Sequence, residues 1–257
     1  MGTGTSQGVP VIAGGCDVCR SKDERDTRFR TSALVTVESG EGEGTNILID
    51  IGPDFRQQML RQGVDHLDAI LITHGHRDHV AGLDDIRSFN YVQHKKMDIY
   101  LNDTARTILE RDYRYVFAPH EFPGLPEAEL HTVDGEAFVV GSGARAVDVV
   151  PIRAMHKDMP ILGYRIGGLG YVTDANHIDD EELRKLQGVD TLVINALRLT
   201  HHYSHFSLPE ALEVIERVGP RRAYLTHISH EMGRHAEVSA TLPEGVELAY
   251  DNLQIEI

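Results

Sequence analysis

One stretch decides how this chain of 257 residues folds: Ala69-Ile70-Leu71-Ile72-Thr73-His74-Gly75-His76-Arg77-Asp78-His79. Its first five residues are a short apolar, β-branched run, which predicts a buried strand. The next six residues carry four side chains of the kinds that bind metals, namely His74, His76, Asp78 and His79. Because the end of a buried strand is a rigid position, these side chains are well placed to form a site.

The chemistry of this run favours a metal centre. Imidazole and carboxylate together suit zinc, manganese or iron, and the choice among them depends on availability. The side chains of a short extended segment alternate in direction, so one such segment can supply two metal ions. The alternative interpretation is a hydrophilic turn in solvent, but three histidines and an aspartate at this spacing after a buried strand favour metal binding. The 15 histidines of the sequence, a high count, point the same way.

The rest of the chain mixes strands and helices. Strands are predicted at 33–37, 46–50, 146–150, 161–166, 171–173, 191–194 and 222–226. Helices are predicted over 53–62, over 104–113 and from Ser207 onward, where Ser207 and Glu210 match a capping box. Residues 117–130 contain three prolines and a glycine, which predicts an irregular loop. No repeat or linker divides the sequence, so a single α/β domain over residues 1–257 is expected.

Composition excludes several classes of function. The formal net charge of −15 would repel phosphate backbones, so extended nucleic acid is not the expected partner. No apolar run reaches the roughly 18 residues of a membrane span, and the start of the sequence lacks the segments of a secretion signal. We therefore expect a cytoplasmic protein without membrane contact. Cys16 and Cys19 are too few for a disulfide scaffold; their spacing fits a redox pair, a structural zinc site or no function at all.

The run from Thr73 to His79, followed by Gly82-Leu83, resembles the His-x-His-x-Asp-His signature of the metallo-β-lactamase superfamily. The resemblance implies a four-layered αβ/βα sandwich with two divalent metal ions at the strand ends. The implied ligands are His74, His76 and His156 for the first metal, Asp78, His79 and His227 for the second, and Asp174 as the bridge. Each later ligand follows a predicted strand, although taken singly it also fits an ordinary partly buried histidine or a turn aspartate.

Further segments resemble the PhnP-type branch of this superfamily. They are Gly2 to Pro10, the cysteine pair, Asn195-Ala196-Leu197-Arg198, His205-Phe206-Ser207 and Thr226-His227-Ile228-Ser229-His230. The branch implies a phosphodiesterase for a small phosphodiester, cyclic ones included, and a homodimer. It also implies a structural zinc ion bound by cysteines and a later histidine, for which the matching residues are Cys16, Cys19 and His230.

Two features depart from that branch. Gly14 stands where its first zinc-binding cysteine is expected, which leaves water or His235 as the fourth ligand of the zinc. The opening strand of the family normally precedes the Gly-Thr-Gly-Thr loop, whereas Met1 directly abuts that loop here. Either the assigned start is late or one sheet lacks a strand.

The resemblance implies hydrolysis by a metal-bound hydroxide, since two metals lower the pKa of a shared water from near 15.7 to about neutrality. The leaving alkoxide then needs a proton donor, which contributes roughly 10² to 10⁴-fold, and histidine suits that task. His205 is the expected acid, with His201 and His202 as rivals, and its alternative role is packing or capping a helix. Asp78, the second predicted catalytic residue, can steer protons as well as bind metal.

Other functions fit the same fold. Thioester or β-lactam hydrolysis, tRNA 3′-end processing and a non-catalytic metal-binding module are alternatives, because a fold does not fix an activity. A tRNA endonuclease needs a basic surface or an RNA-clamping arm, and neither the acidic composition nor the proline-containing loop supplies one. The complete ligand set argues against a non-catalytic module. We therefore predict a metal-dependent phosphodiesterase.

Overall fold

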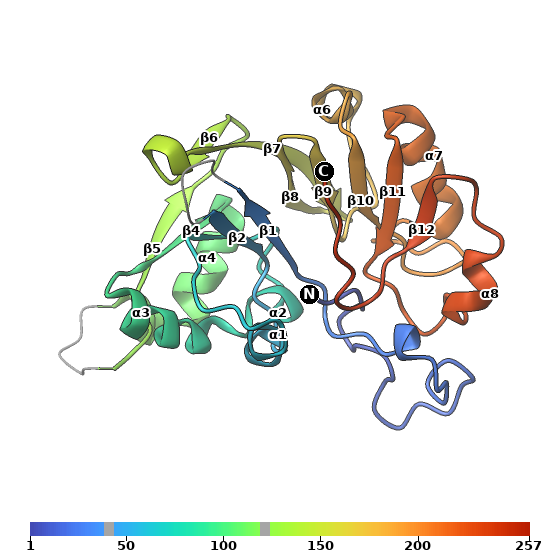
Figure 1. Cartoon of the computed structure of the whole chain (residues 1–257), viewed down its shortest axis with the longest axis horizontal. Coiled ribbons are helices and arrows are strands. Elements are labelled where there is room, and N and C mark those ends of the chain that lie inside the picture. The colour runs from blue at the N-terminus through green and yellow to red at the C-terminus, as the bar shows by residue number, and fades with distance from the viewer. Residues whose placement is uncertain (39–43, 119–123) are drawn as a thin grey trace. The chain divides into compact units, whose positions relative to one another are not determined.

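The computed structural model describes residues 1–38, 44–118 and 124–257, and the chain forms two compact units (Figure 1). The central unit is continuous and comprises Ser32–Val149. The terminal unit combines Met1–Thr31 with Val150–Ile257. Both units contain strands and helices, so the predicted α/β class is confirmed. The single domain over residues 1–257 stays a prediction.

The central unit contains a five-stranded sheet in the order β1-β2-β3-β4-β5. The strands are β1 (Ala33–Val37), β2 (Thr45–Ile49), β3 (Ala69–Leu71), β4 (Met97–Leu101) and β5 (Ala128–Thr132). The pair β1 and β2 is antiparallel, and the pairs from β2 to β5 are parallel. Ile47, Ile70 and Ile99 on the inner strands are fully buried, which explains the continuous apolar runs in the sequence.

Helices and short turns connect these strands. They are α1 (Phe55–Gln62), α2 (Arg77–Val80), η2 (Leu83–Ile86), α3 (Arg87–Gln93), α4 (Asp103–Asp112) and α5 (Arg114–Phe117). The short turn η3 (Gly143–Arg145) follows β5 further along the same unit. Asn102 caps α4 by accepting a hydrogen bond of 2.8 Å from the Ala105 N–H. Helix α1 ends at Gly63, whose left-handed backbone (φ 63°) suits glycine.

The second sheet has the order β12-β11-β10-β9-β8-β7-β6. The strands are β6 (Phe138–Val140), β7 (Val147–His156), β8 (Met159–Ile166), β9 (Leu169–Val172), β10 (Thr191–Asn195), β11 (Arg222–Thr226) and β12 (Val246–Leu248). Strand β7 passes from the central unit into the terminal unit, which holds β8 to β12. Strands β9 to β12 are parallel, so their carboxyl ends share one edge of the sheet. Candidate site residues follow β9 and β11 at this edge.

Three helices of the terminal unit, α6 (Asp180–Leu186), α7 (Leu208–Val218) and α8 (His235–Ser239), share a hydrophobic core with its sheet (Figure 1). The short turn η1 (Glu24–Asp26) lies near the N-terminus. Ala211 and Ile215 of α7 belong to this core together with Leu192 and Leu225 of the strands. The predicted capping box at Ser207 is confirmed, and it fixes the start of α7.

Several predicted elements need correction. Strand β3 ends at Leu71 rather than Thr73, and α1 begins at Phe55 rather than Pro53. The run of candidate metal ligands is not a wholly extended loop, because the Ala81 N–H donates to the Arg77 carbonyl (2.9 Å) and closes the helical turn α2. Residues 128–130 of the predicted loop belong to β5, and residues 119–123 lie outside the described residues. Strands β4, β6 and β12 and helices α3, α6 and α8 were not predicted.

Among the residues that the structure describes, no helix has the length and apolar character needed to cross a membrane.

Candidate metal centre

The first group of candidate ligands lies at the carboxyl end of β3 in the central unit. Ile72 still donates a backbone hydrogen bond to the Tyr100 carbonyl (2.8 Å), and His74 follows two residues later. His74 is 1% exposed and His79 is fully buried, whereas His76 is exposed. The burial of His74 and His79 argues against the alternative interpretation of the run as a turn in solvent.

Asp50 orients this group, and the sequence analysis missed it. It is fully buried directly after β2, with a left-handed backbone (φ 62°). Its Oδ1 accepts a hydrogen bond from the Thr73 N–H (2.8 Å), and its Oδ2 accepts from the Thr73 hydroxyl (2.8 Å) and from His79 Nδ1 (2.6 Å). Because His79 donates through Nδ1, its Nε2 carries the lone pair that a metal ligand needs. Burial raises the pKa of Asp50, although the charge and hydrogen bond of His79 oppose the rise.

The four predicted ligands of the central unit are close together. His74 Nε2 lies 3.0 Å from His76 Nδ1, and the rings of His74 and His79 have centroids 4.2 Å apart. His79 Nε2 lies 3.2 Å from Asp78 Oδ2. Potential ligand atoms therefore meet in two pairs, His74 with His76 and His79 with Asp78, and imidazole with carboxylate is a donor set that fits a divalent metal ion.

Gly75 lets the run pass close to α4. A Cβ atom at this position would lie 2.7 Å from Cδ1 and 3.0 Å from Cβ of Ile108. Only glycine fits without a shift of the helix or of the ligands on either side.

The second group of candidate ligands lies at the carboxyl ends of β7, β9 and β11 in the terminal unit. His156 ends β7, and Asp174 and His227 follow β9 and β11 with left-handed backbones (φ 61° and 53°). Asp174 Oδ2 accepts from the Thr173 hydroxyl (2.8 Å) and lies 3.0 Å from His227 Nδ1. His156 Nδ1 donates to the Asp174 carbonyl (2.8 Å), which leaves its Nε2 with a lone pair. Burial lowers the pKa of His156 and so favours the neutral imidazole.

His205 joins this second group from the loop before α7. Its Nε2 lies 3.1 Å from Asp174 Oδ1. Its ring packs edge-on against His156 (centroids 4.6 Å apart) and stacks on His227 (5.1 Å). Burial lowers the pKa of His205, and the hydrogen bond with Asp174 opposes that change. The side chains of His156, Asp174 and His205 can together hold a metal ion.

The two rival histidines of this loop differ in position. His202 packs near His205, with ring centroids 5.0 Å apart. His201 is exposed and its Nδ1 lies 2.8 Å from Glu210 Oε1 on α7. The loop itself is fixed by the Phe206 N–H, which donates to the carbonyl of Ala175 (2.8 Å). This geometry makes His201 the weaker candidate acid.

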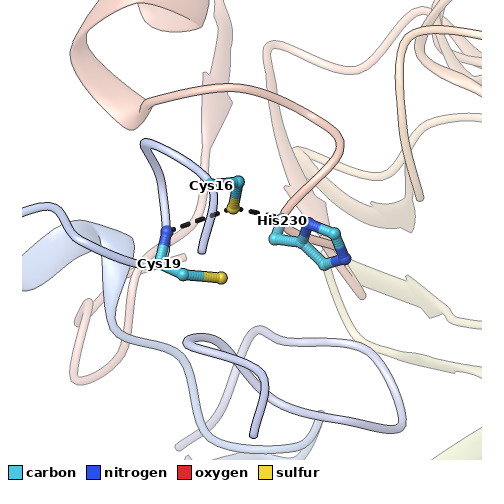
Figure 2. A group of neighbouring side chains, drawn as sticks. All are labelled: Cys16, Cys19 and His230. Atoms are coloured by element: carbon cyan, nitrogen blue, oxygen red, sulfur yellow. Dashed lines mark hydrogen bonds between the residues drawn. The ribbon is translucent and has the colours of Figure 1, made fainter. Parts of the chain in front are cut away.

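The predicted zinc ligands of the terminal unit also come together (Figure 2). The Cys16 Sγ lies 3.6 Å from His230 Nδ1 and accepts a hydrogen bond from the Cys19 N–H (3.4 Å). That hydrogen bond lowers the pKa of the Cys16 thiol, which favours the thiolate that binds metals. His235 is not part of this group, since its ring nitrogens lie 3.2 Å from the Leu248 carbonyl and 3.3 Å from the Ser239 hydroxyl.

Gly14 also bears on this group. A Cβ atom at Gly14 would lie 2.6 Å from Cys19 Sγ and 2.9 Å from the Val11 carbonyl oxygen. A side chain at position 14 would therefore require Cys19 and Val11 to shift. The group offers three protein ligands, one fewer than structural zinc sites usually have.

A cavity of about 500 Å³ lies beside α7 in the terminal unit, and it is lined by none of the candidate metal ligands. Its lining is acidic, with Asp179, Asp180, Glu210 and Glu213. Arg217 of the lining is already paired with Asp180 (2.5 Å), and the His177 ring lies 3.0 Å from Asp179. A phosphate would be repelled from this cavity.

Comparisons with known proteins agree with these findings. A family model described as a β-lactamase superfamily domain matches residues 45–228. The chain is also 39% identical over 256 residues to a Porphyromonas gingivalis protein named octanoyltransferase. That match covers 99% of this chain but 50% of the relative, so the chain spans about half the length of that protein.

Solved structures show the same similarity. The match to the crystal structure of a new diphosphatase from the PhnP family is 37% identical, has a TM-score of 0.88, and covers 98% of this chain and 93% of that one. Zinc-bound PqqB from Methylobacterium extorquens matches with a TM-score of 0.78 and 18% identity over 100% of this chain and 98% of that one. The identity to PqqB is too low to indicate more than a common fold.

Proposed function

The chain belongs to the metallo-β-lactamase superfamily, and on this basis we propose that it is a phosphodiesterase for small phosphodiesters, cyclic ones included. The predicted metallo-β-lactamase fold, the hydrolase class and the likeness to the PhnP family are confirmed by the comparisons. The phosphodiester substrate, the number of metal ions and the roles of individual residues are our proposal. The cytoplasmic location and the homodimer stay predictions.

We propose two divalent metal ions, of zinc, manganese or iron, held by the ligand set that the resemblance implies. That set is His74, His76, Asp78 and His79 from the central unit with His156, Asp174 and His227 from the terminal unit. Cys16, Cys19 and His230 are proposed to hold a separate structural zinc ion. When bound, the two catalytic metals would supply Lewis acidity, which lowers the pKa of water to about neutrality and withdraws charge from a phosphoryl oxygen.

The observation that carries the proposal is the environment of Asp174. One nearly buried carboxylate lies within 3.1 Å of ring nitrogens from His205 and His227, at the carboxyl end of parallel strands. A carboxylate buried among histidines is costly unless cations or protons compensate its charge. A metal-binding role for Asp174 supplies that compensation, and it agrees with the tautomer that the Asp174 carbonyl imposes on His156.

The protein's own side chains orient the candidate ligands and supply the proton. Asp50 holds His79 and the Asp174 carbonyl holds His156 so that each presents Nε2. His205 holds a proton at Nε2 beside Asp174 Oδ1 and is proposed to deliver it to the leaving oxygen. Because burial lowers the pKa of His205, the imidazolium is a stronger acid than in water and the neutral form re-forms readily after transfer. Asp78 remains a proposed metal ligand that can also accept a proton.

The test is hydrolysis of bis(p-nitrophenyl) phosphate and of a 2′,3′-cyclic nucleotide by protein loaded with manganese or zinc. Asp174→Ala is expected to abolish both reactions. Asp179→Ala is the matched control, because this carboxylate is exposed and its ion pair among the described residues is with exposed His177 at 3.0 Å. Failure of the fully loaded wild-type protein on both substrates, or full activity of Asp174→Ala, would overturn the proposal.

The leaving group tests the role of His205. Nitrophenolate leaves without a proton, whereas a ribose alkoxide needs one. His205→Gln is therefore expected to slow hydrolysis of the cyclic nucleotide by about 10² to 10⁴-fold and hydrolysis of the nitrophenyl ester much less. Equal losses on the two substrates would assign His205 to metal binding or packing instead.

A further inference from the structure

One aromatic side chain next to the Asp174 group has no role in the proposed chemistry. Tyr203 is 67% exposed, although it lies in the same loop as His205. Its ring packs against that of His202 (centroids 4.5 Å apart), which in turn packs against His205 (5.0 Å). A large aromatic ring is therefore presented to solvent two side chains away from the proposed proton donor.

The position of Tyr203 is fixed by its neighbours. The Asn176 side-chain amide donates to the Tyr203 carbonyl (3.3 Å) and accepts from the Lys157 N–H (2.7 Å). Asn176 follows Asp174 by two residues, and Lys157 follows His156, so the contacts link the loop to both candidate ligands. A single exposed aromatic residue is ordinary on a protein surface. An exposed ring that packs on His202, with its backbone held by Asn176 beside the candidate ligands, favours a recognition surface.

A cation accompanies the ring. The Lys157 Nζ lies 5.7 Å from the centroid of Tyr203, and its nearest acidic partner, Asp158, is 3.7 Å away and largely exposed. The turn between β7 and β8 aims Lys157 here through a left-handed backbone (φ 57°). This long, exposed side chain can turn from the ring toward a ligand without breaking a buried contact. Positive charge at this place stands out in a chain whose net charge is −15.

The two chemistries together point to one class of ligand. An aromatic face binds planar rings, and base stacking on such a face tolerates every base. A flexible ammonium binds phosphate as a point charge. We propose that Tyr203, His202 and Lys157 form a base-recognition platform, so that the substrate is a phosphodiester that carries a nucleobase. This inference rests on the proposed phosphodiesterase function and adds the substrate class to it.

The sequence offers a direct binding test, because it contains no tryptophan. Tyr203→Trp places a single tryptophan on the platform, and Tyr91→Trp is the control at another exposed tyrosine (63% exposed) on α3. The metal-loaded variants are titrated with AMP, adenosine and ribose 5-phosphate, none of which is a phosphodiester. AMP is expected to quench the tryptophan fluorescence of Tyr203→Trp at the lowest concentration and adenosine at a higher concentration. Ribose 5-phosphate is expected to cause no quenching. Equal quenching of the two variants by AMP would overturn the inference.

Kinetics give a second readout. Tyr203→Ala is expected to raise KM for a 2′,3′-cyclic nucleotide by about 5- to 100-fold with a smaller change in kcat, as expected for the loss of one stacking contact. Tyr203→Phe is expected to keep the wild-type KM, since the ring and not the hydroxyl is required. The KM for a cyclic ribose phosphate without a base is expected to be the same in both variants as in the wild-type protein.

The outcomes separate the two proposals. Hydrolysis of phosphodiesters with the same KM in wild type and Tyr203→Ala would leave the phosphodiesterase standing and remove the base platform. Quenching by AMP in a fully loaded protein that hydrolyses no phosphodiester would support the platform as a nucleotide-binding surface and remove the proposed activity. Lys157→Met is expected to weaken the binding of AMP more than the binding of adenosine. Equal weakening of the two would contradict the proposal that Lys157 binds the phosphate.

Discussion

Asp50→Asn changes one buried atom. It is expected to block metal binding by His79, because it reverses the tautomer of the His79 ring. The Thr73 backbone N–H can only donate, so the carbonyl oxygen of the new asparagine must occupy the Oδ1 position, 2.8 Å from that nitrogen. Its NH₂ group then faces His79 Nδ1, which lies 2.6 Å from Oδ2 in the native protein. His79 must accept at Nδ1, and its proton moves to Nε2, the atom that would bind the metal.

The expected magnitude follows from this geometry. Loss of the carboxylate partner of a ligating histidine typically weakens metal binding by about 10- to 100-fold. At about 1.4 kcal/mol for each factor of ten, the cost is about 1.4 to 2.8 kcal/mol. We would measure manganese and zinc dissociation constants by competition with a chromogenic chelator. Thermal melting of the metal-free protein separates loss of binding from loss of folding.

The chain provides a matched control in Asp98→Asn. Asp98 Oδ1 lies 2.8 Å from His131 Nε2 in an aspartate–histidine pair of the same unit, but both side chains are about one third exposed. Solvent can replace the lost hydrogen bond there, so metal affinity should stay at the wild-type value. The reasoning is refuted if Asp50→Asn folds and binds metal as tightly as Asp98→Asn does.

Three other changes test the structure away from the metals. Ser207→Ala removes the capping box of α7 and should lower the free energy of unfolding by about 0.5 to 2 kcal/mol in urea titrations, whereas Ser239→Ala at a helix C-terminus serves as the comparison. Gly75→Ala places a Cβ atom 2.7 Å from Ile108 and should cost about 1 to 3 kcal/mol by overpacking, which Ile108→Ala should partly restore. The hydrogen bond from Arg221 lowers the pKa of Asp190 to about 2, so the stabilising contribution of the Asp190 carboxylate is present above pH 3.8 and is lost as the pH falls toward 2. Asp190→Asn should therefore make the free energy of unfolding depend less on pH in that range. An unchanged pH dependence would contradict the assignment.

The sequence singles out the run from His74 to His79 as a candidate metal site because its histidines follow an apolar strand within one short segment. It also placed His156, Asp174 and His227, and the structure brings these three together at strand ends. The resemblance made that possible, since a lone histidine after a strand carries little information by itself. The ligand roles of these residues stay predictions until metal binding is measured.

Asp50 was missed although a sequence signal exists. It directly follows the apolar residues Ile47-Leu48-Ile49, and a carboxylate at the end of a buried strand is expensive unless it has a partner. Its partner His79 lies 29 residues further along the chain, and no local pattern links such positions. Tyr203 was missed for a similar reason, since its exposure and its contact with Lys157 depend on the tertiary structure.

Short elements were the other weakness of the sequence analysis. Strands β6 and β12 have three residues each, which is too few for alternation to be recognised. The helical turn α2 could not be distinguished from a loop, because His79 and Asp78 give no helical apolar stripe. In contrast, α7 has both a capping box and a stripe of apolar residues, and its start was predicted correctly.

The arrangement of the two units has a consequence for the order in which the protein assembles. The first residues of the chain are tied to the last: the side chain of Asp251 accepts hydrogen bonds from the N–H and hydroxyl of Thr3, 248 positions earlier. The stretch Ser32–Val149 has its internal contacts within one continuous segment and can form them while the ribosome is still extending the chain. Residues 1–31 are made before the central unit but must wait for the strands that follow it in the sequence, which makes the terminal unit the slower one to complete.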